Sequence, residues 1–222
     1  MKPHVSNLHG CKRAVYLHGF ASAPSSGKAQ FFAQRFSEEG IGLEIPQLDE
    51  GDFANLTITK QLRAVERVVN QEPVVLLGSS MGGYLAALYA SQHPEVSRLV
   101  LMAPAFYFPQ RWPESLGAER THNWRRTGTM DVFHYGEGRI RQIGYSLIED
   151  AMQYDGTPNF KQPALIFHGL ADKTIPAAYS KEFAAGHLNV TLRLLDSDHQ
   201  LTDQIEVMWT ETRRFLELPG PT

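Results

Sequence analysis

Cysteine is nearly absent from this sequence of 222 residues, in which Cys11 is the only one. A single cysteine cannot form an internal disulfide, and Cys11 lacks neighbours at the spacing of a metal-binding motif. The sequence therefore excludes a disulfide scaffold and predicts no metal site. Sparse cysteine is also typical of proteins from a reducing compartment.

Long hydrophobic runs and an excess of charge of one sign are missing as well. The first ten residues contain no apolar run that would serve as a signal-peptide core, and no later run approaches membrane-spanning length. The formal net charge of -3 leaves no electrostatic footprint for nucleic acid or for an anionic membrane. We therefore expect a cytoplasmic protein with no nucleic-acid partner and no stable membrane insertion.

The composition that remains is that of an ordinary globular protein. Hydrophobic residues make up 42% of the chain and charged residues 20%, close to the average for soluble domains. The length suits one hydrophobic core, so we take residues 1–222 as a single domain. The composition does not decide the oligomeric state, and a homodimer stays open.

Short apolar runs alternate with helical patterns along most of the chain. The segments that predict strands are residues 14–17, 42–46, 74–77, 99–102, 164–167 and 191–195. The patterns that predict helices cover residues 27–39, 55–71, 81–93, 177–185 and 202–216. This alternation indicates an α/β fold with a doubly wound, mostly parallel sheet of about six strands.

The segment 106–158 interrupts the alternation and is too long to be a bare connection between two elements. It is rich in aromatic residues, among them Phe106, Trp112 and Trp124. We interpret it as a cap, inserted between the fourth and fifth strands and lying over the carboxyl edge of the sheet. The three aromatic side chains are then expected to bind substrate. The alternative is a helical subdomain that only lengthens the core.

One pentapeptide in this pattern indicates chemistry. Gly78-Ser79-Ser80-Met81-Gly82 matches G-x-S-x-G between a predicted strand and a predicted helix. Glycines at such a sharp turn leave room for the central serine, Ser80, to adopt a strained backbone that exposes its hydroxyl. The turn also brings the Met81 N–H and the helix N-terminus beside Ser80, where they stabilise a developing oxyanion. Ser79 is the rival nucleophile, but its offset from the glycines does not fit the pattern.

A serine nucleophile needs an adjacent base, and that base needs a third group to hold its tautomer. Asp172 follows one predicted strand and His199 follows the next, so both fall at the carboxyl edge that carries Ser80. The order Ser, Asp, His is the one that accompanies the G-x-S-x-G turn. We therefore predict Ser80 as nucleophile, His199 as base and Asp172 as the orienting acid.

Each of these assignments has a structural alternative. Asp172 also suits the N-cap of the helix that follows it, and Asp196 and Asp198 are rival acids. His199 also suits a surface position at the start of the last helix. The second oxyanion donor is expected in the loop after the first strand, where we assign the Phe20 N–H; the alternative is a plain glycine turn.

Ser25-Ser26-Gly27-Lys28 superficially suggests a phosphate-binding loop. The motif requires a glycine five positions before Gly27 and a serine or threonine after Lys28, and the sequence has neither. We therefore predict no nucleotide site there.

At this point the residues resemble the α/β-hydrolase superfamily across nearly the whole chain. The pieces similar to small bacterial carboxylesterases are Leu17-His18-Gly19-Phe20, Gly78-Ser79-Ser80-Met81-Gly82-Gly83-Tyr84 and Ser197-Asp198-His199. The segment 145–151, YSLIEDA, is similar to the branch that contains the mitochondrial depalmitoylating thioesterase and acyl-glucuronide esterase. The resemblance implies the roles already assigned to the serine, the aspartate and the histidine, and it implies an eight-stranded sheet. Residues 1–13 are too short for the first two of those strands, so about six are expected.

These observations predict a serine hydrolase that cleaves carboxylic ester or thioester bonds through an acyl-enzyme on Ser80, with no metal or organic cofactor. The expected partner is a small-molecule ester or thioester. One alternative is a hydrolase of another bond: carbon-carbon, lipid or peptide. Another is a ligand receptor that keeps the fold without turnover.

Overall fold

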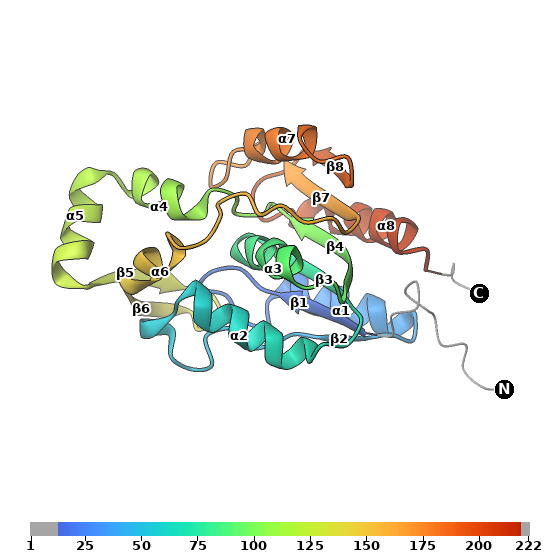
Figure 1. Cartoon of the computed structure of the whole chain (residues 1–222), viewed down its shortest axis with the longest axis horizontal. Coiled ribbons are helices and arrows are strands. Elements are labelled where there is room, and N and C mark those ends of the chain that lie inside the picture. Colours follow the sequence, from blue (N-terminus) through green and yellow to red (C-terminus); the bar gives the residue numbers. More distant parts are fainter. Residues whose placement is uncertain (1–12, 219–222) are drawn as a thin grey trace.

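The computed structural model describes residues 13–218 and contains a six-stranded sheet (Figure 1). The strand order is β2-β1-β3-β4-β7-β8, and every neighbouring pair is parallel. The strands are β1 (Arg13–Leu17), β2 (Gly42–Glu44), β3 (Val74–Ser79), β4 (Val96–Met102), β7 (Ala164–Gly169) and β8 (Val190–Leu195). The predicted fold class is confirmed. The interpretations of Cys11 and of N-terminal strand pairing fall outside the described residues.

Two groups of helices cover the two faces of this sheet. They are α1 (Gly27–Glu38), α2 (Ile58–Val69), α3 (Met81–Gln92), α7 (Ala177–Ala185) and α8 (Ile205–Leu216). Helices α1 and α8 share one hydrophobic cluster, in which Phe32 and Phe36 pack on Trp209. Helices α2, α3 and α7 contribute to the cluster on the opposite face. The sheet is therefore covered on both sides, as continuous apolar strands require.

Strand β3 lies at the centre of this arrangement. Its Leu77 pairs in register with Tyr16 of β1 and with Val100 of β4. All six residues of β3 are buried. Their side chains alternate between the two clusters, with Leu76 in one and Leu77 in the other. The end of β3 is thus held rigidly from both faces and both edges.

Two predicted helices begin later than the apolar pattern indicated. Helix α2 starts at Ile58 because the Thr57 side chain caps it, accepting a hydrogen bond from the Lys60 N–H at 3.1 Å. A short 3-10 helix, η1 (Phe53–Asn55), precedes it. Helix α8 starts at Ile205, after a second 3-10 helix, η2 (Thr202–Gln204). In each case periodicity alone merged a 3-10 turn with the α-helix that follows it.

The segment between β4 and β7 forms the predicted insertion, at the end of the molecule away from both termini (Figure 1). Its elements are α4 (Phe108–Leu116), α5 (Ala118–Thr127), β5 (Thr129–His134), β6 (Arg139–Gly144) and α6 (Ser146–Ala151). Strands β5 and β6 pair as an antiparallel hairpin, which the sequence interpretation missed. Most residues of these two strands are exposed or half-buried, and several are charged. The two strands therefore lack the apolar run that marked the strands of the main sheet.

Hydrogen bonds fasten this insertion to the rest of the chain. The Asp150 carboxylate accepts from the Thr59 N–H at 2.8 Å and from the Thr59 hydroxyl at 2.6 Å. The Tyr107 N–H donates to the Gly156 carbonyl, and the Tyr84 hydroxyl donates to the Asp155 carbonyl. These hydrogen bonds therefore connect the insertion to α2 and α3, and the bond between Tyr107 and Gly156 joins the two ends of the insertion to each other.

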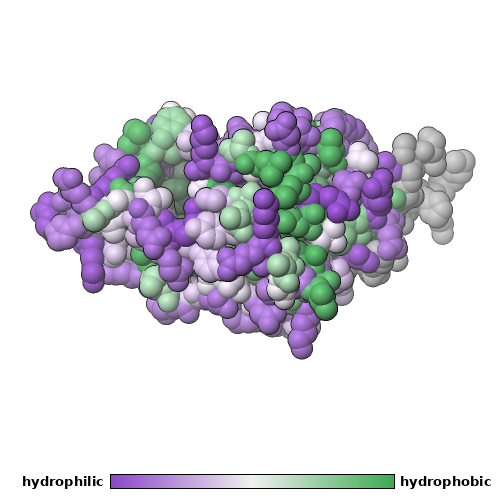
Figure 2. Space-filling view, turned by 90° about the horizontal axis from the view of Figure 1, so that it is seen from above, coloured by the Kyte–Doolittle hydropathy of each residue, from purple (hydrophilic) through white to green (hydrophobic). Residues whose placement is uncertain are grey.

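The surface is mixed in character. Hydrophilic residues predominate on the face in Figure 2, and hydrophobic residues gather there in smaller groups. Among residues 13–218, no helix combines the length and the apolar character needed to cross a bilayer.

Candidate active site

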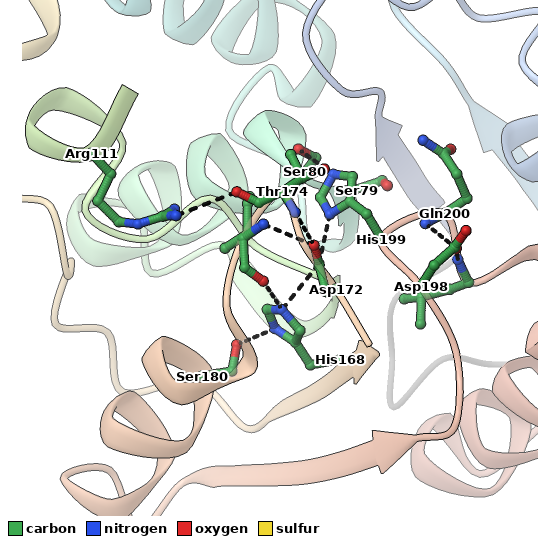
Figure 3. Close-up of polar contacts among 12 residues, drawn as sticks. Ser79, Ser80, Arg111, His168, Asp172, Thr174, Ser180, Asp198, His199 and Gln200 are labelled. Atoms are coloured by element: carbon green, nitrogen blue, oxygen red, sulfur yellow. Dashed lines mark hydrogen bonds and ion pairs between the residues drawn. The ribbon is translucent and has the colours of Figure 1, made fainter. Parts of the chain in front are cut away.

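Ser80 occupies a sharp turn between β3 and α3 (Figure 3). Its backbone has φ 54° and ψ -118°, a combination that side chains rarely adopt and that indicates local strain. The Ser80 N–H donates to the Met102 carbonyl at 2.9 Å, which helps to hold this conformation. Crowding explains the flanking glycines: a Cβ on Gly78 would lie 2.3 Å from the Gly82 carbonyl oxygen, and one on Gly82 would lie 2.0 Å from that of Leu17.

The structure brings together the three residues predicted to react. His199 Nε2 lies 3.1 Å from Ser80 Oγ, and His199 Nδ1 lies 2.7 Å from Asp172 Oδ2. The three residues follow β3, β7 and β8, whose parallel carboxyl ends meet at one edge of the sheet. Because the ionised carboxylate can only accept, Nδ1 carries the proton and Nε2 is left to accept from the serine hydroxyl.

The Asp172 carboxylate is buried and fully engaged. Its Oδ1 accepts from the backbone N–H groups of Thr174 and Ile175, each at 2.8 Å, and its Oδ2 also lies 3.2 Å from His168 Nε2. Burial on its own would raise the pKa of Asp172. Hydrogen bonds from His168, His199 and the Ile175 N–H outweigh that effect and hold the pKa well below its usual range. The carboxylate therefore stays ionised at neutral pH.

The rival acids have other contacts. Asp198 Oδ1 accepts from the N–H groups of Gln200 and Leu201, which makes it part of a local turn. The backbone carbonyl of Asp196 accepts from the Gln204 side chain. Among residues 13–218, no contact is found between the Asp196 carboxylate and the His199 imidazole. Of the three candidate acids, Asp172 is the one that reaches His199.

Two backbone N–H groups beside Ser80 are free to bind an anion. Within the described residues, neither the Met81 N–H nor the Phe20 N–H donates to a protein acceptor. Met81 is the first residue of α3, where the N–H groups have no intrahelical partner. The loop of Phe20 lies against the turn, because a Cβ on Gly19 would sit 3.4 Å from Ser80 Cβ. Both residues line the cavity described next.

A cavity of about 330 Å³ opens beside Ser80. Its apolar wall consists of Phe20, Ala105, Phe108, Trp112 and Ile175. The Trp112 ring centroid lies 4.8 Å from that of Phe20 and 5.3 Å from that of Phe108, which joins the insertion to the loop that contains Phe20. Apolar walls with a few polar groups are typical of small-molecule sites.

Of the three aromatic residues expected to bind substrate, only Trp112 lines this cavity. Phe106 is fully buried and stacks on Phe183 with ring centroids 4.2 Å apart. Trp124 is 1% exposed and donates from its indole to the Ile143 carbonyl at 3.0 Å. The structure therefore places Phe106 and Trp124 in the core. The sequence did not indicate this, because the position of a residue in the chain does not show which way its side chain faces.

Sequence reasoning also missed residues that the structure brings to the site. Phe108, Arg111 and Ser115 line the cavity beside the predicted Trp112, and the four residues occupy the i, i+3, i+4 and i+7 positions of α4. That spacing marks one face of a helix and is the signal that would have found them.

A buried lysine, Lys28, also contacts the turn between β3 and α3. The Lys28 ammonium donates to the hydroxyl of Ser79 at 3.0 Å. Burial lowers the pKa of Lys28 to about 8, with Asp198 and Asp172 acting in the opposite direction. Sequence reasoning had considered Lys28 only as part of a phosphate loop, since a lysine is rarely expected inside a core.

Comparisons with known proteins bear on the fold and on the family. The model of the uncharacterised protein family UPF0227 matches residues 13–215. The chain is 28% identical over 218 residues to palmitoyl-protein thioesterase ABHD10, mitochondrial, of Mus musculus, covering 92% of this chain and 69% of that protein. It is 28% identical over 165 residues to monoacylglycerol lipase abhd6-B of Xenopus laevis, covering 68% of this chain and 44%, less than half, of the lipase.

The solved structures agree with this picture of the fold. Alpha/beta hydrolase domain-containing protein 10 from mouse superposes with a TM-score of 0.79 at 20% identity, covering 92% of this chain and 89% of that one. The architecture is therefore that of the α/β-hydrolases. At this level of identity the likeness concerns the fold alone.

Proposed function

We propose that this chain, which belongs to the uncharacterised protein family UPF0227, is a serine hydrolase that cleaves carboxylic ester or thioester bonds. The proposal depends above all on the hydrogen-bonded series from Asp172 through His199 to Ser80 beside an apolar cavity. The names of its relatives, a palmitoyl-protein thioesterase and a monoacylglycerol lipase, support the same bond classes.

In the first half of the reaction, Ser80 Oγ attacks the carbonyl carbon of the substrate while His199 Nε2 takes the serine proton. Asp172 keeps the imidazole in the required tautomer and stabilises the imidazolium. The carbonyl oxygen becomes an oxyanion, which the Met81 and Phe20 N–H groups bind. The bond to the leaving group then breaks, and His199 donates its proton to the departing alcohol or thiol.

In the second half, water attacks the acyl group on Ser80 and gives its proton to His199. The ester bond to Ser80 breaks, the serine recovers its proton, and the carboxylic acid leaves. This chemistry requires no metal or organic cofactor. We propose that residues 106–158 act as the cap of the site, with Trp112 as a substrate contact. The cytoplasmic location stays a prediction, and the homodimer stays open.

The test is turnover of a short-chain aryl ester and an acyl thioester by the purified protein. Ser80→Ala is expected to lower kcat by about 10³-fold or more, because the nucleophile is lost. Ser79→Ala is the matched control, since it removes the neighbouring hydroxyl of the same turn and should keep activity within about tenfold, the range of an indirect effect. No turnover by the folded parent, or equal losses in both variants, would contradict the proposal.

A further inference from the structure

Two positive charges line a cavity that is otherwise largely apolar. Arg111 of α4 and Lys173 of the loop after β7 contribute to its wall. No acidic side chain is found among the described residues that line it. In the described part of the chain, neither cation has an ion-pair partner. The whole chain has a net charge of -3, so this local excess of positive charge does not follow from overall composition.

Arg111 is held in a fixed orientation without being neutralised. Its guanidinium donates to the Thr174 carbonyl at 3.3 Å (Figure 3). It also stacks over the Tyr179 ring at 4.4 Å from the centroid. A single hydrogen bond to a carbonyl leaves most of the five N–H donors of the guanidinium available. A planar, pre-oriented fork of donors is suited to a carboxylate or phosphate.

Lys173 stands beside Asp172 in sequence, yet among residues 13–218 no ion pair joins the two side chains. The Asp172 carboxylate is buried and bonded to His168, His199 and backbone N–H groups. Lys173 is exposed and lines the cavity. Lys173 therefore contributes to the cavity wall without a paired anion from the neighbouring residue.

We propose that Arg111 and Lys173 are specificity-determining residues that bind an anionic group, a carboxylate or a phosphate, on a substrate whose remainder is apolar. This inference rests on the proposed ester or thioester hydrolysis and adds its substrate class. The apolar wall of Phe108 and Trp112 takes the hydrocarbon part, and the two cations take the charge. The electrostatic attraction between an anion and these cations is stronger in a cavity, where there is less water to screen it, than at an open surface.

The test compares ester substrates in which one carboxyl group is either ionised or methylated, and it follows cleavage of the aryl ester bond that both members share. One pair is 4-acetoxybenzoate and its methyl ester, which places the charge on the leaving group. The other pair is the 4-nitrophenyl ester of adipic acid, with its second carboxyl either free or methylated, which places the charge on the acyl group. At about pH 7.5 both free carboxyls are ionised. The measured quantity is the ratio of kcat/KM within each pair.

In the parent we expect a preference of about tenfold or more for the anionic member of at least one pair, in keeping with a charge-assisted hydrogen bond. Raising the salt concentration should reduce that preference. The double variant Arg111→Gln, Lys173→Gln should lose that preference, so that the ratio within each pair falls to about one, because neither cation is left to contact the anionic member.

Two further variants separate charge from structure. Arg111→Lys keeps the charge but alters the contacts with Thr174 and Tyr179, and it should retain the preference. Arg126→Gln removes an exposed arginine of α5 that does not line the cavity, and its ratios should equal those of the parent. A parent ratio near one in both pairs, or an unchanged ratio in the double variant, would overturn the inference. Absence of turnover of all four esters would instead overturn the proposed function.

Discussion

At the scale of single residues, the network around Asp172 explains how the imidazole is held. His168 Nε2 donates to the Ile175 carbonyl at 2.8 Å and lies 3.2 Å from Asp172 Oδ2, while its Nδ1 accepts from the Ser180 hydroxyl at 2.7 Å. His168 is thus held by contacts at both ring nitrogens, with Nε2 directed toward the Ile175 carbonyl and the carboxylate. It acts through Asp172 as a positioning residue, and His199 is the one that reaches Ser80.

Replacing the acid tests this network. In Asp172→Asn the amide can present an N–H to His199, which favours the tautomer that cannot accept the Ser80 proton. We expect kcat for an aryl ester to fall by about 10³-fold or more. Asp198→Asn is the matched control, because Asp198 is exposed and its carboxylate accepts from the N–H groups of a local turn, and it should stay within about threefold, as expected of a surface change. A small loss in the first variant, or equal losses in both, would remove Asp172 from the mechanism.

Lys28 gives a prediction about stability and pH. Burial holds its pKa at about 8 in the folded protein, whereas in the unfolded chain the pKa returns to about 10.4. Between these values the unfolded state binds more protons, so the contribution of Lys28 to the free energy of unfolding rises with pH. The difference between the parent and Lys28→Met should therefore increase from about pH 8 to about pH 10.4, and stay flat below about pH 7.

Urea denaturation at a series of pH values measures this difference, with m-values checked for equality. Subtracting the variant removes titrations that the two proteins share, such as those of buried tyrosines. A difference that is constant over the whole range would show that Lys28 is not buried as its contact with Ser79 indicates.

The contrast among these residues shows where sequence reasoning works. The juxtaposition of Ser80, His199 and Asp172 was predictable because each follows a strand and parallel strands end at one edge. Lys28 and Arg111 were not predicted as site residues. The spacing along α4 marks the helix face that carries Arg111, but whether a charged side chain is buried or lines a cavity depends on packing between helices and loops that are distant in sequence.

At the scale of elements, the turn around Ser80 depends on close backbone approach. Gly82→Ala would place a Cβ 2.0 Å from the Leu17 carbonyl oxygen, so either β1 or α3 must shift. We expect a loss of about 3 kcal/mol or more in the free energy of unfolding, as for severe overpacking. Gly42→Ala is the control, since its Cβ would meet no atom within 4 Å. Similar stabilities for both variants, measured by urea denaturation, would contradict this account of the turn.

The contact between the insertion and α2 is tested by replacing Asp150. Asp150→Asn cannot accept from both the N–H and the hydroxyl of Thr59 as the carboxylate does. We expect faster hydrogen exchange in α6 and in the β5–β6 hairpin, and a cost of about 1–3 kcal/mol for the unsatisfied donor. Asp131→Asn is the control, because Asp131 is exposed and bonds only to Gln142 at 3.3 Å. Unchanged exchange in Asp150→Asn would show that this contact does not anchor the insertion.

Prediction of the elements succeeded where the apolar pattern was continuous and failed where it was not. The buried strands of the main sheet and helix α7 were placed within a few residues. The β5–β6 hairpin was missed because one of its faces is exposed and its strands carry charged residues. Such strands are specified by pairing with each other and by packing on the core, which a single-segment pattern does not show.

At the scale of the whole molecule, the two layers of helices and the parallel sheet have one functional consequence. They bring the ends of β3, β7 and β8 to the side of the sheet where the insertion lies, away from the termini (Figure 1). Ser80, Asp172 and His199 therefore follow strands of the sheet, whereas helix α4 of the insertion supplies four of the eleven residues that line the cavity. We expect changes in the insertion to alter substrate preference and changes at the strand ends to alter turnover.

The most direct test of this account is covalent labelling with a fluorophosphonate, followed by peptide mass spectrometry. The account predicts one adduct per chain, on Ser80, and much slower labelling in His199→Ala because the base that activates the serine is lost. An adduct on Ser79 or on any residue other than Ser80, or no adduct on the folded parent, would contradict it.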